Sequence, residues 1–181
     1  MGEDAILQRD TLAVPVTIRL CRETDLPALE WFGEFTPHRE IIRRTFATQA
    51  RGDGSMVLAD VNGFPAGQVW IDYERKRHLR RATIWAVRVF PAFRRCGIGT
   101  RLMLAAERLV TARGVDEIEL GIDRDNLGVI HFYERLGYEP SGTERGTYSY
   151  RTPDGRTVDV AIDQILLHKR LNDRHTRHAA Q

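Results

Sequence analysis

The chain has 181 residues, 42% of them apolar, a formal net charge of +2 and two cysteines, Cys21 and Cys96. Its length and apolar content are typical of one folded domain, and no apolar run approaches the ~18 residues of a membrane-spanning helix. The small charge disfavours nucleic acid as a partner, the two cysteines predict no disulfide framework, and an N-terminus without a secretory apolar region favours a cytoplasmic protein.

Before residue 82, periodicity and turn residues predict a strand, two helices and a hairpin. Asn62-Gly63 is a pair typical of a tight hairpin turn. In chain order the expected elements are a strand over 16–21, a short helix from Thr24, a helix over 37–50, and strands over 56–61 and 66–73. The mostly basic run over 74–81 is expected to be a connector near the edge of a cleft. It is either solvated or a site for a phosphate or an acidic substrate.

The segment over 84–110 organises the rest of the chain, because it predicts a strand, a glycine turn and a helix. Ile84–Phe90 is apolar, β-branched or aromatic, as a buried strand should be, and Pro91 ends it. Gly97 and Gly99 allow a tight turn. From Ile98 onward, apolar residues follow helical spacing with charged residues on the other face.

The glycine turn before this helix is a candidate seat for a phosphate or pyrophosphate. A helix N-terminus presents unpaired N–H groups and the positive end of its dipole, and the flanking arginines add charge. The alternative is an ordinary turn with solvated arginines. The turn is no Walker A loop, since no Gly-Lys-Ser/Thr follows, and it lacks the third glycine of the dinucleotide fingerprint, where Leu102 stands.

The last third of the chain predicts a strand over 118–122, a helix from Asp125 or Asn126 to Gly137, and strands over 147–150 and 158–168 around a turn at 152–156. The strand–helix–strand crossover makes the strands at 84–90 and 118–122 parallel. We therefore expect an α/β fold with a mixed sheet, antiparallel at both ends with one parallel pair, and a ligand cleft at the carboxyl ends of that pair.

Domain bounds can be placed from these elements. We expect one domain over residues 15–171, a flexible leader over residues 1–14 and a flexible tail over residues 172–181. No Cys/His cluster has metal-ligand spacing, so no metal is expected.

Two motifs now stand in order. Arg94-x-x-Gly97-x-Gly99 follows Val89-Phe90-Pro91, and the segment from Asn126 to Tyr138 (NLGVIHFYERLGY) follows the next strand. The chain resembles the GNAT superfamily of N-acetyltransferases in both motifs and their separation, and the order of strands and helices extends the resemblance from about residue 16 to about residue 170. It implies a GNAT-like fold with helices on both faces of the sheet.

The resemblance also implies a function: direct transfer of an acetyl group from acetyl-CoA to a primary amine. Backbone N–H groups of the turn would cradle the pyrophosphate, the strand before it would pair with the pantetheine arm, an N–H near Val89 would polarise the acetyl carbonyl, and Asn126 would bond the pantetheine region. The implied binding residues are Val87, Arg88, Val89, Arg94, Arg95, Cys96, Gly97, Ile98, Gly99, Thr100 and Asn126.

Tyr133 in the second motif is the predicted general acid, since a phenol is protonated at neutral pH and can donate to the leaving thiolate. Its alternative is a core aromatic. The base stays open: Trp85 and Gly121 stand where many family members carry a glutamate. The remaining candidates are Glu119, Asp123, Glu34, Asp72, His131 and a water relay.

The acceptor also stays open between a small molecule and a protein amine. Acidic residues at Glu23, Glu30, Glu34 and Glu40 would suit a cationic amine, if they are not simply solvated. The alternative to an enzyme is a non-catalytic acetyl-CoA-binding sensory module of the same fold, which Trp85 favours and Tyr133 disfavours. A homodimer is compatible with the sequence, which does not decide the oligomeric state.

Overall fold

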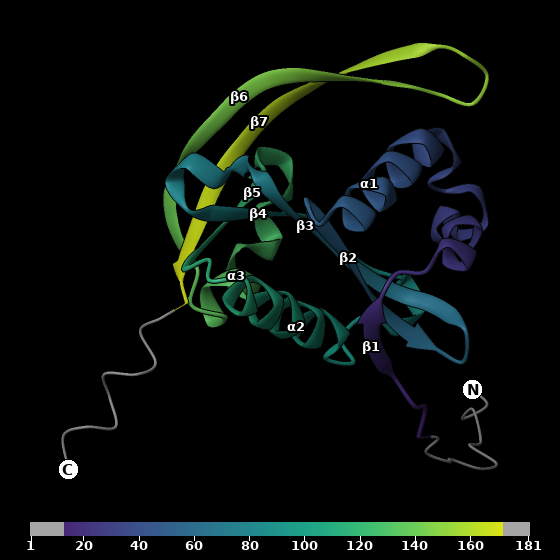
Figure 1. The fold of residues 1–181 in the computed structure, drawn as a ribbon, viewed down its shortest axis with the longest axis horizontal. Helices are drawn as coiled ribbons and strands as arrows, with labels where there is room; N and C mark the ends of the chain where they lie inside the picture. Colours follow the sequence, from purple (N-terminus) through teal and green to yellow (C-terminus); the bar gives the residue numbers. More distant parts are fainter. Residues whose placement is uncertain (1–12, 172–181) are drawn as a thin grey trace, which may run out of the picture.

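A computed structural model of the protein describes residues 13–171 (Figure 1). The expected tail, and nearly all of the expected leader, lie outside the described residues. Within them, strands form one sheet in the order β1-β2-β3-β4-β5-β7-β6. The bounds are β1 Thr17–Leu20, β2 Gly54–Val61, β3 Phe64–Lys76, β4 Arg81–Val89, β5 Glu117–Asp123, β6 Glu139–Arg151 and β7 Thr157–Arg170. Neighbouring strands are antiparallel except β4 and β5, which form the predicted parallel pair.

Helices cover both faces of this sheet, so the predicted fold class is confirmed. The α-helices are α1 Arg39–Arg51, α2 Ile98–Ala112 and α3 Ile130–Arg135, and the 3-10 helices are η1 Glu23–Gly33, η2 Thr36–His38, η3 Arg77–Leu79, η4 Pro91–Phe93 and η5 Arg124–Val129. Alternate residues of β2 and β3 point to opposite faces. Val57 and Val69 pack with α2 on one face, and Met56 and Trp70 pack with α1 and η1 on the other.

Two glycines shape this part of the fold: Gly63 in the β2–β3 turn and Gly67 where α2 packs on β3. The β2–β3 turn has Asn62 at φ 51° and Gly63 at φ 82°, the left-handed pair that a type I′ hairpin requires. In β3, a Cβ on Gly67 would stand 2.9 Å from Leu102 and 3.0 Å from Ile98 of α2. A side chain at this position would therefore push α2 and its N-terminus away from β4.

Two expectations differ from the structure. The helix expected from Asp125 or Asn126 begins as η5, and Asn126 has non-helical angles within it, so the regular helix α3 starts only at Ile130. The closing hairpin is also longer than predicted, since β6 reaches back to Glu139. The missed part, residues 139–146, is almost entirely exposed and contains no apolar alternation that would predict a strand. Figure 1 shows β6 and β7 arching over the sheet toward α1.

The longest described helix, α2, has 15 residues. None of the helices within residues 13–171 is long and apolar enough to cross a membrane.

Candidate functional site

The parallel pair β4–β5 is hydrogen-bonded at one end only. Its register runs from Arg81 opposite Glu117 to Ile84 opposite Leu120 and then stops, although β4 continues to Val89 and β5 continues beside β7. The two strands therefore part. We call the paired half the closed end and the parted half the open end. The open end lies at the carboxyl ends of the strands, where the cleft was predicted.

A β-bulge in β4 marks the point where the strands part. Trp70 of β3 pairs with Trp85, but Gln68, two residues back, pairs with Arg88, three residues on. The extra residue is accommodated by Ala86, which has a left-handed φ of 51°. A bulge bends its strand and re-aims the residues beyond it. In this chain it turns the last part of β4 away from β5.

Hydrogen bonding at the end of β4 shows which backbone groups face the open end. Phe90 N–H donates to Ala66 O of β3 at 2.8 Å. Backbone groups alternate in direction along a strand, so those of Arg88 face β3, whereas those of Val87 and Val89 face the gap left by β5. Val89 O accepts from Arg94 Nε at 3.1 Å, as this direction requires. The gap-facing N–H groups of Val87 and Val89 thus form a strand edge that pairs with no strand within residues 13–171.

The N-terminus of α2 lies directly after this edge. Gly97 precedes the helix with φ 75° and provides no side-chain cap, and Arg101 N–H is bonded to Gly97 O at 3.2 Å. The N–H groups of Ile98, Gly99 and Thr100 come before that first helical bond, so they lack an intrahelical acceptor. Three donors and the positive end of a 15-residue helix point out of the protein at this place.

Arginine side chains hold the turn in shape. The Arg101 side chain donates a hydrogen bond to Cys96 O at 3.2 Å, across the turn. Within the turn, Arg95 has a left-handed φ of 64°, and the Cys96 side chain is an exposed free thiol. The side chains of Arg94 and Arg95 are exposed beside the helix start. Because neither arginine is ion-paired with a described carboxylate, both keep their charge available to an anion.

The first motif, the second motif and β4 meet at one point. A Cβ on Gly99 would lie 3.3 Å from Phe132 of α3 and 3.8 Å from Val89. The next residue of α3, Tyr133, is only 8% exposed and contacts the rings of Phe132 and Tyr138. Burial raises the pKa of Tyr133 to about 12, so its phenol holds its proton at neutral pH. Asn126, by contrast, is exposed on η5.

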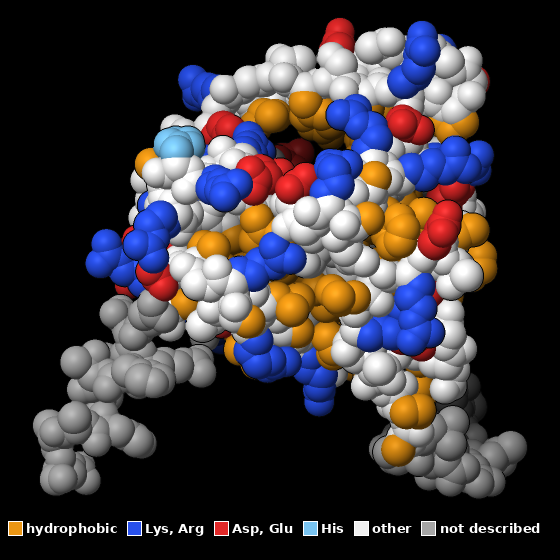
Figure 2. All heavy atoms as spheres, viewed as in Figure 1, with side chains coloured by type: hydrophobic (Ala, Val, Ile, Leu, Met, Phe, Trp, Pro, Cys, Tyr) orange, Lys and Arg blue, Asp and Glu red, His pale blue; other side chains and the backbone are white. Residues whose placement is uncertain are grey.

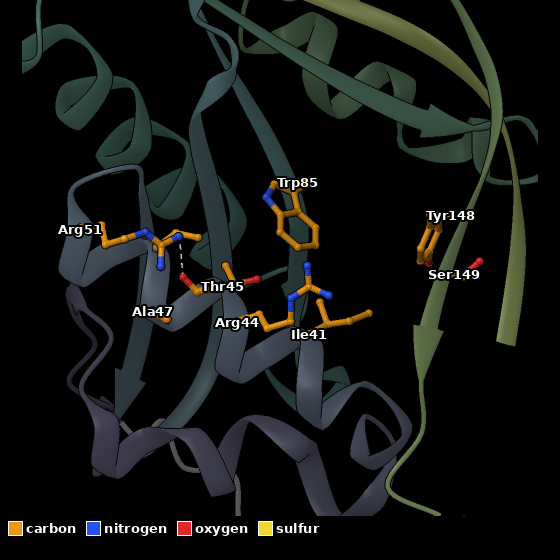
Figure 3. Close-up of a pocket in the computed structure, with 9 residues that line it drawn as sticks. Ile41, Arg44, Thr45, Ala47, Arg51, Trp85, Tyr148 and Ser149 are labelled. Atoms are coloured by element: carbon orange, nitrogen blue, oxygen red, sulfur yellow. Dashed lines mark hydrogen bonds between the residues drawn. The ribbon is translucent and has the colours of Figure 1, made fainter. Parts of the chain in front are cut away.

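A cavity of about 420 Å³ lies on the other face of the sheet, between α1, β4 and β6 (Figure 3). Trp85 of β4, Tyr148 of β6 and Ile41 and Arg44 of α1 project toward it from three elements. Figure 2 shows the molecule hollowed beneath the β6–β7 hairpin. The residues that line this cavity include no carboxylate. Trp85 stands where many family members carry a glutamate, and its ring forms part of the cavity wall.

Several of the candidate bases are held in ion pairs or hydrogen bonds with other residues. Glu119 is 4% exposed at the closed end, paired with Lys76 and Arg81. Asp72 accepts the N–H groups of two following residues, and exposed His131 pairs with Glu134.

The place of the second family glutamate is also filled. A Cβ on Gly121 would clash with the side chain of Gln164 from β7, which donates to Asp123 at 2.7 Å. A neutral amide therefore occupies the space that a glutamate at position 121 would need.

The basic run over 74–81 lies at the closed end, since β4 begins at Arg81 and the turn follows Val89 at its other end. Its cations are paired: Arg75 with Glu144, Lys76 with Glu119 and Arg80 with Asp116. The expectation that this run lies near the cleft edge is wrong, because the β3–β4 hairpin carries it to the opposite end of the strand. The run connects strands and stabilises them.

The family profile described as "Acetyltransferase (GNAT) family" matches residues 22–138. The chain belongs to the GNAT acetyltransferase family. A curated relative, an uncharacterized N-acetyltransferase of Methanocaldococcus jannaschii, is 37% identical over 101 residues, which are 53% of this chain and 44% of that protein. The match thus spans less than half of the relative's length.

Solved GNAT structures share the fold over most of the chain. An N-acetyltransferase from Staphylococcus aureus Mu50 has a TM-score of 0.67 at 18% identity, covering 87% of this chain and 99% of that one. A ribosomal-protein-alanine N-acetyltransferase from Escherichia coli has a TM-score of 0.63 at 26% identity over 87% and 94%. A PaiA N-acetyltransferase from Thermoplasma acidophilum, in complex with coenzyme A, has a TM-score of 0.62 at 17% identity over 86% and 99%.

Sequence reasoning missed the side chains on the α1 face of β4. The resemblance put Arg88 among the coenzyme-binding residues through its backbone, whereas its backbone faces β3 and its guanidinium lies over the ring of Phe35. The signal in the sequence was a single charged residue between Val87 and Val89, in the otherwise apolar segment Ile84–Phe90. Gln164, which fills the space beside Gly121, left no signal in the sequence because β7 is distant along the chain.

Proposed function

We propose that this GNAT protein is an N-acetyltransferase that uses acetyl-CoA and a primary amine. The parting of β4 from β5 next to an uncapped α2 N-terminus carries this proposal. A strand edge with free N–H groups suits the amides of a pantetheine arm, and the helix start suits a pyrophosphate. Both features lie end to end, so one extended ligand can use them together.

The donor side assigns roles to backbone groups. The N–H groups of Ile98, Gly99 and Thr100 would bind the pyrophosphate, with Arg94 and Arg95 supplying charge. The N–H of Val87 would bond the pantetheine arm. The N–H of Val89 would donate to the acetyl oxygen as negative charge develops there, an oxyanion-hole role worth about 100-fold in turnover. Asn126 would reach the pantetheine region from η5.

Tyr133 would protonate the leaving sulfur. In the transfer, the amine nitrogen bonds to the acetyl carbon, the carbon–sulfur bond breaks, and the thiolate takes a proton from the phenol. The amine must give up its own proton. Since the residues lining the cavity include no carboxylate, we assign that proton to water in the cavity, which relays it to solvent.

Two measurements on the full chain test this function. Calorimetry with coenzyme A and with acetyl-CoA is expected to show one site per chain. A free-thiol assay with acetyl-CoA and a mixed panel of amines is expected to show acceptor-dependent release. Tight binding without release on any amine would favour the non-catalytic sensory module, and absence of coenzyme binding would overturn both functions.

A further inference from the structure

Arg88, on the α1 face of the sheet, has no ion-pair partner among the described residues. Its guanidinium carbon lies 4.2 Å from the centroid of the Phe35 ring and 5.8 Å from that of Trp70. Within residues 13–171, no carboxylate stands within ion-pair distance of it. By contrast, Arg19, which is also partly buried, pairs with both Asp25 and Asp60.

An unpaired guanidinium between aromatic rings is electrostatically incomplete. Burial lowers the pKa of Arg88 from its usual value, and the nearby carboxylate of Glu34 opposes this only through space. The rings contribute cation–π attraction, but they cannot occupy a fork of five N–H donors. A charged group left in this state in the absence of substrate is complementary to an anion that arrives with it.

Two neighbouring polar atoms also have no hydrogen-bond partner in the described part of the chain. Gln68, opposite Arg88 in the β3–β4 pairing, is 1% exposed; its oxygen accepts from Trp70 Nε1 at 2.9 Å, while its Nε2 is buried and unbonded. His38 Nδ1 is likewise buried and unbonded, and burial, then the charge of Arg88, lower the pKa of His38. His38 is therefore neutral at pH 7 and adds no second positive charge.

Trp70 links Arg88 to the cavity, whose lining includes Trp85 but not Arg88 itself. Trp70 contacts Trp85 edge-on at 4.7 Å, and Trp85 and Tyr148 both line the cavity. Glu30, one of the acids expected to attract a cationic amine, is instead held by Arg39 and Thr36. This region thus presents an unpaired guanidinium and the unbonded amide N–H groups of Gln68, which suit a carboxylate, and its positive charge repels a polyamine.

We propose that Arg88 binds a carboxylate of the acceptor, so that the acceptor is a small amino acid rather than a simple amine or polyamine. This inference rests on the proposed acetyl transfer. Val87 and Val89, on either side of Arg88, direct their N–H groups to the thioester side. The carboxylate and the reacting amine are then separated by about one arginine side chain, which fits a compact amino acid.

The test compares each of a panel of free amino acids with its own α-amide as acceptor, in a thiol-release assay with the full chain. The two acceptors differ in the carboxylate, and the amide has the less basic amine, which would favour it. We expect kcat/KM to favour the acid by at least ~10-fold, in line with a charge-assisted hydrogen bond. In the Arg88→Gln variant, a higher KM for the acid should bring the acid-to-amide ratio of kcat/KM close to one. Arg88→Lys should give an intermediate ratio.

Arg108→Gln is the matched control, because Arg108 is an exposed arginine on α2, across the sheet from Arg88. It should keep the wild-type ratio. The inference is overturned if the wild type uses acid and amide equally well, or if it acetylates only amines that have no carboxylate. Either result leaves the proposed acetyltransferase function intact. If the wild type does not bind coenzyme A, the proposed function is overturned instead. The wild-type ratio decides the matter even if Arg88→Gln fails to fold.

Discussion

The closed and open ends of the β4–β5 pair use the same residue types for opposite purposes. At the closed end, Lys76, Arg80 and Arg81 are each paired with a carboxylate. At the open end, Arg88 and Arg95 have no ion pair with a described residue. Paired cations stabilise strand contacts, whereas unpaired ones remain free for a ligand. Position along one strand, rather than composition, thus separates structural from binding arginines.

The largest expected effect is at the open end. Tyr133→Phe should lower kcat about 100-fold, since a positioned acid contributes that much, with little change in acetyl-CoA affinity. Steady-state kinetics and calorimetry check both parts. Tyr138→Phe is the matched control, because that phenol is 1% exposed in the core beside α3. Unchanged turnover in Tyr133→Phe would remove the acid role.

The pH dependence of turnover sharpens this assignment. Because the pKa of Tyr133 is raised to about 12, its acid form persists well above pH 10, the value for an ordinary phenol. Turnover of the wild type should therefore show no falling limb between pH 8 and about 10. If turnover falls in that range, and this fall is absent in Tyr133→Phe, the phenol has an ordinary pKa. Tyr133 would then be more exposed to solvent than its 8% exposure indicates.

The helix start is the next target. Gly97→Val should weaken coenzyme A binding about 30-fold, because a left-handed φ costs a non-glycine residue about 1–2 kcal/mol and the altered turn displaces the N–H donors of α2. Calorimetry measures the affinity. Gly146→Ala on β6, where a Cβ meets open space and φ is not left-handed, is the control and should bind normally. Normal binding by Gly97→Val would place the phosphate elsewhere.

At the closed end, Glu119→Gln should lower the free energy of unfolding by about 2 kcal/mol, since it removes a buried carboxylate shared by Lys76 and Arg81. Denaturant unfolding measures this change. Coenzyme A affinity of the folded variant should stay at the wild-type level. A loss of affinity without a loss of stability would contradict the separation of the two ends.

The smallest effect compares one arginine from each end. Arg95→Gln should weaken coenzyme A binding about threefold and reduce its salt dependence, because an exposed charge contributes under ~1 kcal/mol and is screened. Arg80→Gln, which removes an exposed closed-end cation paired with Asp116, should change neither. Equal effects of both variants would mean that the overall charge, and not the turn, attracts the ligand.

Local patterns were enough to predict the elements that surround the proposed donor site. Strand 84–90, the glycine turn, the helix from Ile98 and the parallel crossover all depend on neighbours in sequence, and they are confirmed. The roles of Val87, Val89, Tyr133 and the turn residues remain predictions that the experiments above test. The start of α3 was misplaced because η5 continues with non-helical angles at Asn126, which apolar spacing does not reveal.

The sequence by itself determined most of the elements, the parallel pair and the start of α2 after its glycine turn, since periodicity and glycine chemistry act over a few residues. Only the tertiary structure decided where β4 parts from β5, that the basic run lies at the closed end, and that Gln164 fills the space beside Gly121. It also left Arg88 unpaired beside Phe35. These features depend on strand register and on contacts between strands distant in the chain, which local sequence patterns do not reveal.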